Sequence, residues 1–261
     1  MIAFRFTRLS RMTVFGAGVL AFAPLVSRPA LARVPQPPAT TDRPAPEQAD
    51  APAPKMGRDG QVESSFAQHH EAFLKRGKEG KIGVLFLGDS ITEGWGGAKD
   101  VWEAHFGKDD PANFGISGDR TQHVLWRIAN GELDGIKPRV LVLMIGTNNI
   151  GNPTEEILRG DLAIVNEIHK KLPKTKLLLL GIFPRGREAS DPAREKIKMV
   201  NNALSKLDRK KNVRYLDIGD KFLDAMGTLP PDIMPDALHP NHKGYEIWAD
   251  AIQPTLDKMM K

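Results

Sequence analysis

The 261-residue chain contains no cysteine, which excludes a disulfide, a thiolate nucleophile and a lipid-modified N-terminal cysteine. It also lacks an excess of charge outside its first 32 residues. That opening segment holds four arginines and no acid, whereas residues 33–261 contain 33 lysines and arginines against 32 acidic residues. A body this close to neutral offers no electrostatic argument for binding nucleic acid or an anionic membrane.

Long apolar runs are also lacking. The longest, residues 12–26, is shorter than the roughly 20 residues that span a bilayer, and Pro24 interrupts it. Three arginines precede this run, and an A-x-A sequence follows it at residues 30–32, an arrangement typical of secretory signal peptides. We therefore predict that residues 1–32 are a cleaved signal peptide and that the protein is exported to the periplasm, cell surface or medium, with no stable membrane insertion. An uncleaved anchor helix is the alternative.

Proline is concentrated in one stretch. Residues 33–59 contain seven prolines and almost no large apolar side chain. Such a composition cannot bury enough surface to offset the entropy lost on ordering, and it is typical of extended linkers. We predict a disordered linker over residues 33–59, with docking of a partner protein on the prolines as the alternative, followed by one globular domain over residues 60–261.

Uninterrupted apolar runs mark this globular part. They cover residues 82–87, 140–145 and 177–180, each followed by a glycine, and a weaker run covers residues 213–218. Runs of this kind suit strands that are buried on both faces, as in a parallel sheet covered by helices. Helical patterns alternate with them, so the sequence predicts a single three-layer α/β domain.

The helical segments between these runs have recognisable starts. Asn152 and Asp191 each precede a proline, and both are predicted N-caps. A last helix around residues 245–259 is expected to be kinked or interrupted at Pro254. For the helix that follows Asn152, the 3.6-residue period assigns the buried face to Leu158, Leu162, Val165 and Leu172.

Polar clusters follow the predicted strands. Residues 88–90 follow the first run, residues 117–119 follow a shorter segment, and residues 147–149 follow the second run. Asp236 and His239 lie near the C-terminus. Because the carboxyl ends of parallel strands meet at one edge of a sheet, where α/β proteins bind ligands, we expect these clusters to lie together.

Each of these residue types suits a step of acyl transfer. A serine between a strand and a helix can act as nucleophile, with its own N–H at the positive helix end, and Ser90 is so placed. Gly118 would let a backbone N–H approach an oxyanion, and Asn148 would add a side-chain donor. Asp236 could orient His239 as the general base for Ser90. The sequence therefore indicates a serine nucleophile with a histidine base.

The clusters, taken in order, resemble the blocks of the SGNH (GDSL) hydrolase superfamily. Gly88-Asp89-Ser90 resembles the nucleophile block, Gly118 the glycine block, Asn148 the asparagine block, and Asp236-x-x-His239 the terminal block. The G-x-S-x-G elbow of the α/β-hydrolases is absent, which sets that fold aside.

Within the superfamily, the amino-acid sequence between the blocks is similar to that of the catalytic subunits of platelet-activating factor acetylhydrolase. Residues 113–149 and the later run 180–186 match that family in order and spacing, and the resemblance covers roughly residues 62–260. The chain departs from the family in its predicted signal peptide and linker, and in Ser117, where many members have glycine.

The resemblance implies a three-layer α/β/α, flavodoxin-like fold with a five-stranded parallel sheet, and a serine esterase that needs neither cofactor nor metal. It implies oxyanion-hole donors at the N–H groups of Ser90 and Gly118 and the side chain of Asn148. It also implies a small acyl pocket, which would map to Ile91, Thr147 and Leu238. A homodimer is expected because related catalytic subunits form dimers.

We predict from this an exported hydrolase of short-chain, chiefly acetyl, O-esters, which acts through a Ser90–His239–Asp236 triad and an acyl-enzyme intermediate. Export favours acetylated carbohydrates or small esters as substrates, and acetyl phospholipids or lysophospholipids are the alternative. A surface-tethered, non-catalytic binding module is the alternative of another class.

A metal site is the remaining alternative for the terminal cluster. Asp236, His239 and His242 have a ligand-like spacing, but Pro240 breaks any helix that would place them on one face. We therefore predict no metal.

Overall fold

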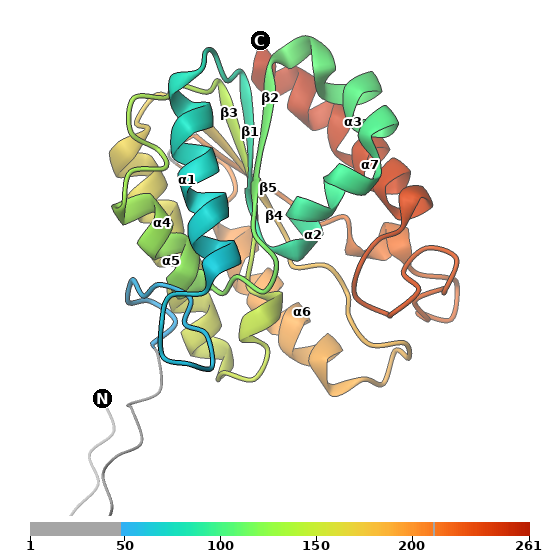
Figure 1. The fold of residues 1–261 in the computed structure, drawn as a ribbon. Helices are drawn as coiled ribbons and strands as arrows, with labels where there is room; N and C mark the ends of the chain where they lie inside the picture. Colours follow the sequence, from blue (N-terminus) through green and yellow to red (C-terminus); the bar gives the residue numbers. More distant parts are fainter. Residues whose placement is uncertain (1–47, 211) are drawn as a thin grey trace, which may run out of the picture. The chain divides into compact units, whose positions relative to one another are not determined.

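A five-stranded parallel sheet forms the centre of the protein, which we describe from a computed structural model over residues 48–210 and 212–261 (Figure 1). The order across the sheet is β2-β1-β3-β4-β5, and every neighbouring pair is parallel. The strands are β1 (Val84–Gly88), β2 (Pro111–Gly115), β3 (Val140–Met144), β4 (Lys176–Leu180) and β5 (Val213–Leu216).

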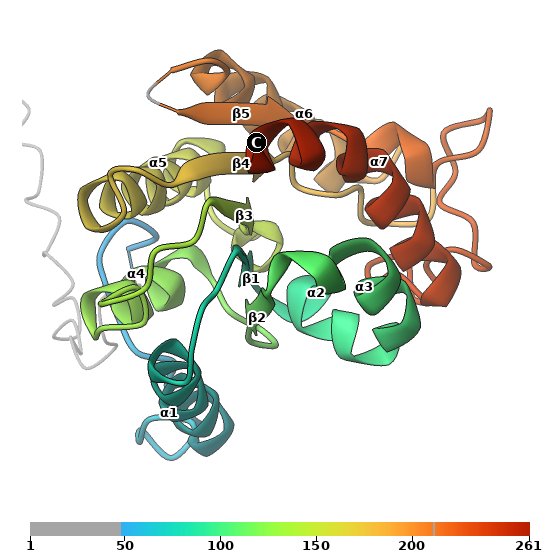
Figure 2. The ribbon, with the colours of Figure 1, turned by 90° about the horizontal axis from the view of Figure 1, so that it is seen from above.

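Helices cover both faces of this sheet, and Figure 2 shows the two groups on either side of it. Because successive side chains of a strand point to opposite faces, Leu85 and Leu87 join one buried cluster while Val84 and Phe86 join the other. The first cluster packs beneath α1 (Ser64–Lys78), α4 (Thr121–Ala129), α5 (Thr154–Lys171) and α6 (Pro192–Leu204). The second packs beneath α2 (Ser90–Glu93), α3 (Lys99–Phe106) and α7 (His242–Met260).

The predicted three-layer, flavodoxin-like fold with five parallel strands is thereby confirmed. In this strand order the chain direction across the sheet reverses between β1 and β3, and ligands of such folds bind beyond the carboxyl ends of the strands at this switch point. The polar clusters that follow β1, β2 and β3 therefore lie at the edge where a site is expected.

Two helix predictions need correction. Helix α5 begins one residue later than expected, because Pro153 is itself the extended N-cap residue, while Asn152 Nδ2 donates to Glu156 Oε2 at 2.9 Å. Its buried face agrees with the prediction at Val165 and, just past the helix, at Leu172, whereas Leu158 and Leu162 are only partly buried. The buried residues of the helix are Ile157, Gly160, Asp161, Ile164, Val165 and Ile168. Helix α6 begins as predicted, with Asp191 accepting a hydrogen bond from the Ala193 N–H.

The last helix, α7, is continuous through Pro254, so the predicted interruption does not occur. Pro254 cannot donate to the carbonyl one turn earlier, that of Asp250, but both residues are exposed and water can satisfy that oxygen. Among the described residues, no helix has the length and apolar character that crossing a bilayer would require.

The predicted linker is ordered over its described part. Ala49 is fully buried and its carbonyl accepts a hydrogen bond from Thr121 Oγ1 at 2.7 Å. The Ala53 N–H donates to Gln122 O, and Met56 forms a β-bridge with Val62. These partners at the start of α4 satisfy the backbone of a proline-rich segment, so disorder does not extend over residues 48–59. The predicted signal peptide and residues 33–47 lie outside the described residues.

Candidate active site

Ser90 stands at the junction of β1 and the short helix α2. Asp89 caps this helix, because its Oδ1 accepts a hydrogen bond from the Ile91 N–H at 3.0 Å. Ser90 is the first residue of the helix, so its own N–H has no partner within the helix. Its Oγ lies 2.9 Å from His239 Nε2, across 149 residues of sequence. The fold thus places a serine hydroxyl in hydrogen-bond contact with an imidazole.

The other nitrogen of that imidazole contacts a carboxylate. His239 Nδ1 lies 2.6 Å from Asp236 Oδ2, while Asp236 Oδ1 accepts hydrogen bonds from the N–H groups of Leu238 and His239. Partial burial opposes ionisation of Asp236, but the hydrogen bonds and the charge of His239 outweigh it and lower the pKa of Asp236 below its ordinary value. An ionised Asp236 favours the tautomer with the proton on Nδ1, which leaves Nε2 free to accept the proton of Ser90.

Gly118 and Asn148 lie on the loops that follow β2 and β3. Gly118 has a φ of +74°, a conformation that glycine adopts at little cost, and its N–H has no acceptor among the described residues. Asn148 Nδ2 donates one hydrogen to Asp119 O at 2.8 Å, which fixes the amide and leaves its second hydrogen available. One contact thus joins the two loops that carry the predicted donors.

The three residues of the predicted acyl pocket occupy different environments. Ile91 and Thr147 are buried, and Leu238 is half-buried. The Thr147 carbonyl accepts a hydrogen bond from Arg185 at 2.8 Å. Each residue adjoins a site residue in sequence, but none of them lines the cleft that contains Ser90 and His239. An acyl pocket at these positions therefore stays a prediction.

That cleft has a volume of about 330 Å³. Besides Ser90 and His239 its lining includes Ser117, Asn241 and His242, together with two glycines that leave it open, Gly94 and Gly97. Tyr245, from α7, closes one side, and its hydroxyl donates to Ile91 O at 2.7 Å. A small cleft beside a serine–histidine pair suits a small ester.

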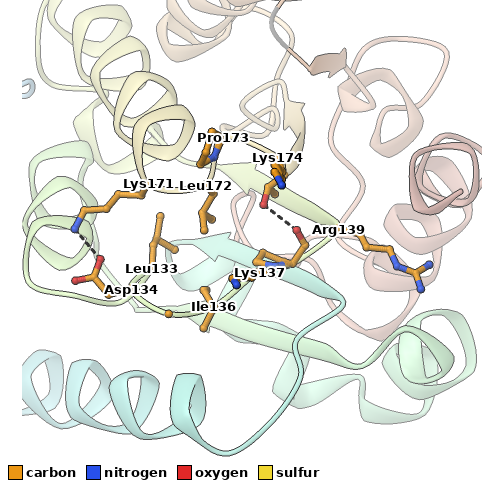
Figure 3. A pocket seen from close by; sticks show the side chains of 12 residues that line it. Leu133, Asp134, Ile136, Lys137, Arg139, Lys171, Leu172, Pro173 and Lys174 are labelled. Carbon is orange, nitrogen blue, oxygen red and sulfur yellow. Dashed lines mark hydrogen bonds and ion pairs between the residues drawn. The ribbon is translucent and has the colours of Figure 1, made fainter.

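A second hollow lies at the opposite edge of the sheet. Figure 3 shows this pocket of about 630 Å³, lined by residues 133–139 and 171–175, which directly precede β3 and β4. Lys171 pairs there with Asp134 at 2.7 Å, and Thr175 Oγ1 donates to Pro138 O. None of the predicted site residues lines this larger pocket, so the volume of a pocket does not by itself identify the active site.

Arg127, a fully buried arginine beneath the nucleophile, was not among the predicted site residues. Its guanidinium contacts Asp119 at 2.9 Å and Glu132 at 2.7 Å, and it donates to Gly88 O and Phe114 O. Arg127 thus ties the ends of β1 and β2 to the loop of Gly118. It lies in residues 113–149, which match the acetylhydrolase subunits. This match was the only feature of the sequence that could have pointed to a role for Arg127.

A second missed arginine holds the segment that carries the acid and the base. Arg187 donates to three carbonyls of that segment, those of Leu229, Met234 (3.2 Å) and Pro235 (2.7 Å). The Gly186 N–H adds a bond to Ala237 O at 2.9 Å. The residues that precede Asp236 are therefore held through their backbone carbonyls as well as through the buried side chains of Leu229 and Met234.

Two buried carboxyl groups lie behind the nucleophile. Burial raises the pKa of Asp89 to about 7, and it raises the pKa of Asp161 well above its ordinary value. Neither oxygen of Asp161 has a hydrogen-bond partner among the described residues, nor does Asp89 Oδ2. Asp161 is on α5, where it lies beside Gly146 at the end of β3.

The residues of the metal alternative do not converge. His239 lies between Ser90 and Asp236, whereas His242 Nε2 turns to Asp100 at 2.9 Å. Within the described ranges, no three His, Asp or Glu side chains group closely enough to hold a metal ion.

Comparison with known proteins gives one consistent result. Residues 86–247 match the model of the GDSL-like lipase/acylhydrolase family. Platelet-activating factor acetylhydrolase IB subunit alpha2 of Rattus norvegicus is 39% identical over 196 residues, which cover 75% of this chain and 85% of the relative. The alpha1 subunit of Homo sapiens is 33% identical over 215 residues, with coverages of 82% and 92%.

Solved structures share the fold. A GDSL-like lipase from Bacteroides thetaiotaomicron superimposes with a TM-score of 0.59 at 20% identity, over 72% of this chain and 97% of that one. A catalytic mutant of an acetylxylan esterase from Geobacillus stearothermophilus gives 0.53 at 21% identity, over 69% and 96%. At this identity the likeness concerns the fold alone.

Proposed function

Because the chain belongs to the GDSL-like lipase/acylhydrolase family and is a carboxylic ester hydrolase, we propose that it removes short acyl groups, acetyl above all, through Ser90, His239 and Asp236. One observation carries this proposal. Ser90 Oγ, both imidazole nitrogens and the Asp236 carboxylate form one continuous chain of contacts of 2.9 Å and 2.6 Å. A nucleophile, a base and a group that orients the base are thus in line.

The reaction follows from these contacts. Ser90 Oγ attacks the ester carbonyl carbon while its proton passes to His239 Nε2, and a tetrahedral intermediate forms. The carbon–oxygen bond to the alcohol then breaks, and the proton moves from Nε2 to the leaving oxygen. A water molecule, activated by the same nitrogen, cleaves the acyl-enzyme and restores Ser90. Asp236 stays ionised throughout and stabilises the imidazolium.

The negative oxygen of the intermediate needs donors. The Ser90 N–H, the Gly118 N–H and the second hydrogen of Asn148 Nδ2 are the groups available at this edge of the sheet. Removal of one such donor costs about 10²–10³ in kcat in well-studied acyl-transfer enzymes. We assign the oxyanion hole to these three groups.

The relatives change the preferred substrate. Their names specify acetylhydrolysis of platelet-activating factor, a choice that the sequence analysis ranked second, and we now place acetyl phospholipids first. Acetylated carbohydrates come second, on the ground that polar residues, Ser117, Asn241 and His242, line part of the cleft. Export remains part of the proposal. N-terminal sequencing of the secreted protein tests it, and the mature chain should begin at residue 33.

Hydrolysis of p-nitrophenyl acetate tests the chemistry. Wild-type protein should release p-nitrophenol, and Ser90→Ala should lose at least about 10³-fold in rate, because the nucleophile is gone. Ser205→Ala, at an exposed serine just after α6, is the matched control and should keep the activity. Equal rates for wild type and Ser90→Ala would refute the assignment. Acetate release from an acetyl phospholipid and from acetylated xylan, measured side by side, then ranks the two substrate classes.

A further inference from the structure

Lys55 reaches the loop of Gly118 from the segment that was expected to be a linker. Its Nζ donates to Ser117 O at 2.8 Å, and only 18% of its side chain is exposed. A Cβ built on Gly118 would lie 3.0 Å from the same nitrogen, so the ammonium packs directly against this glycine. Lys55 also lies outside residues 86–247, which match the family model.

The position of Lys55 is fixed on several sides. Glu63 accepts a hydrogen bond from Nζ at 3.1 Å, and the Glu63 N–H in turn donates to Lys55 O at 2.8 Å. Hydrogen bonds from Ser65 and Lys55 lower the pKa of Glu63 below its ordinary value. The Ala53 N–H is bonded to Gln122 O, which holds the preceding backbone on α4.

The peptide between Ser117 and Gly118 explains why this contact matters. In a trans peptide the carbonyl and the N–H point in opposite directions. Lys55 holds the carbonyl side, so the Gly118 N–H on the other side points away from the lysine. A charged donor on the carbonyl also draws electrons from the amide, which strengthens its N–H as a donor. Glu93 fixes the preceding peptide by accepting from the Ser117 N–H at 2.7 Å.

We propose that Lys55 is a positioning residue of the oxyanion hole, which holds the Ser117–Gly118 peptide and polarises it toward the developing oxyanion. This inference rests on the proposed function of Gly118. Lys55 does not touch the substrate in this scheme. It acts through one amide, and its effect should therefore appear in kcat much more than in KM.

Two measurements on Lys55→Met test the inference. With p-nitrophenyl acetate, kcat should fall about tenfold, less than the 10²–10³ that loss of a whole donor costs, and KM should stay within about twofold. In amide NMR spectra, the Gly118 proton should shift upfield because its peptide is no longer polarised. Lys55→Arg, which keeps a charged donor, should restore both values. Lys81→Met, at an exposed lysine paired with Asp110, is the control.

The outcomes separate this inference from the proposed function. A Gly118 amide that does not move in folded Lys55→Met, or a kcat equal to that of Lys81→Met, overturns the role of Lys55. A parallel fall in kcat and in the folded fraction, with no rescue by arginine, also overturns it. If wild-type protein hydrolyses no ester, the proposed function fails, while the Gly118 shift still decides whether Lys55 polarises the peptide.

Discussion

The two halves of the candidate site are built differently. The nucleophile half, residues 88–90 and 115–119, rests on a buried arginine and buried carboxyl groups at the ends of β1 and β2. In the acid–base half, residues 229–239, the side chains of Asp236 and His239 are 56% and 41% exposed, although Leu229 and Met234 of the same segment are buried. The nucleophile thus rests on buried charged groups, whereas the acid and the base are exposed on a segment that is held by buried apolar side chains and by hydrogen bonds to its backbone.

This difference separates stability from activity. Loss of the buried arginine of the nucleophile half should destabilise the protein, because the same guanidinium holds the sheet ends together. A change in the support of the acid–base half should leave the fold intact and displace Asp236 and His239 from Ser90.

The strongest test removes the arginine of the nucleophile half. Arg127→Met should lower the free energy of unfolding by about 3–5 kcal/mol, because it leaves Asp119 and Glu132 buried without their cation. Urea unfolding measures the loss. Lys75→Met, which removes a charge from an exposed pair, should change stability by less than about 0.5 kcal/mol. If Arg127→Met lowered the free energy of unfolding as little as Lys75→Met does, the nucleophile half would not depend on its buried arginine.

The acid–base half should respond in activity instead. Arg187→Met frees the carbonyls of Leu229, Met234 and Pro235, and it should lower kcat about 10–100-fold, since a displacement near 1 Å can cost 10²-fold. The free energy of unfolding should fall by only about 1–2 kcal/mol. Arg214→Met, a half-exposed arginine on β5, is the control for kcat. A stability loss equal to that of Arg127→Met, with kcat per folded molecule unchanged, would contradict the distinction.

The smallest expected effect is a gain in stability. A carboxyl group whose pKa is raised by folding keeps its proton while the unfolded chain ionises, so stability falls as pH rises from about 4 toward the folded pKa. Asp161→Leu removes such a group and should stabilise the protein by about 1–2 kcal/mol, more at pH 8 than at pH 5. Asp161→Asn keeps the shape and should lose the same pH dependence. An equal gain at both pH values in urea unfolding would refute this account.

The sequence predicted the sheet well because parallel strands buried on both faces leave uninterrupted apolar runs. It also predicted that Ser90, Gly118 and Asn148 would meet, since they follow strands at one edge. The buried face of α5 was predicted only in part: Val165 and Leu172 are buried as expected, but the stripe from Ile157 to Ile168 also includes a carboxyl group. A search for apolar periodicity does not assign a buried position to an aspartate, so the burial of Asp161 is seen only in the folded structure.

The supports of the site left no local signal. Lys55 contacts a carbonyl 62 residues away, Arg127 one 39 residues away and Arg187 one 48 residues away. Nothing in the sequence distinguishes such a lysine or arginine from one that is exposed to solvent. Each of them bonds backbone oxygens, and every residue of the chain carries a backbone oxygen. These contacts depend on how the loops pack against one another in the folded protein. The spacing of residues along the chain does not predict that packing.

The long separation between Ser90 and His239 also has a consequence for biosynthesis. The nucleophile is translated 149 residues before the base, which corresponds to about 7–30 s at ordinary rates of 5–20 residues per second. Helix α7, which supplies Tyr245 to hold the nucleophile helix, comes later still. A nascent chain therefore carries its serine without a partner base, and hydrolytic activity arises only after the segment that holds His239 has been made and has docked beside Ser90.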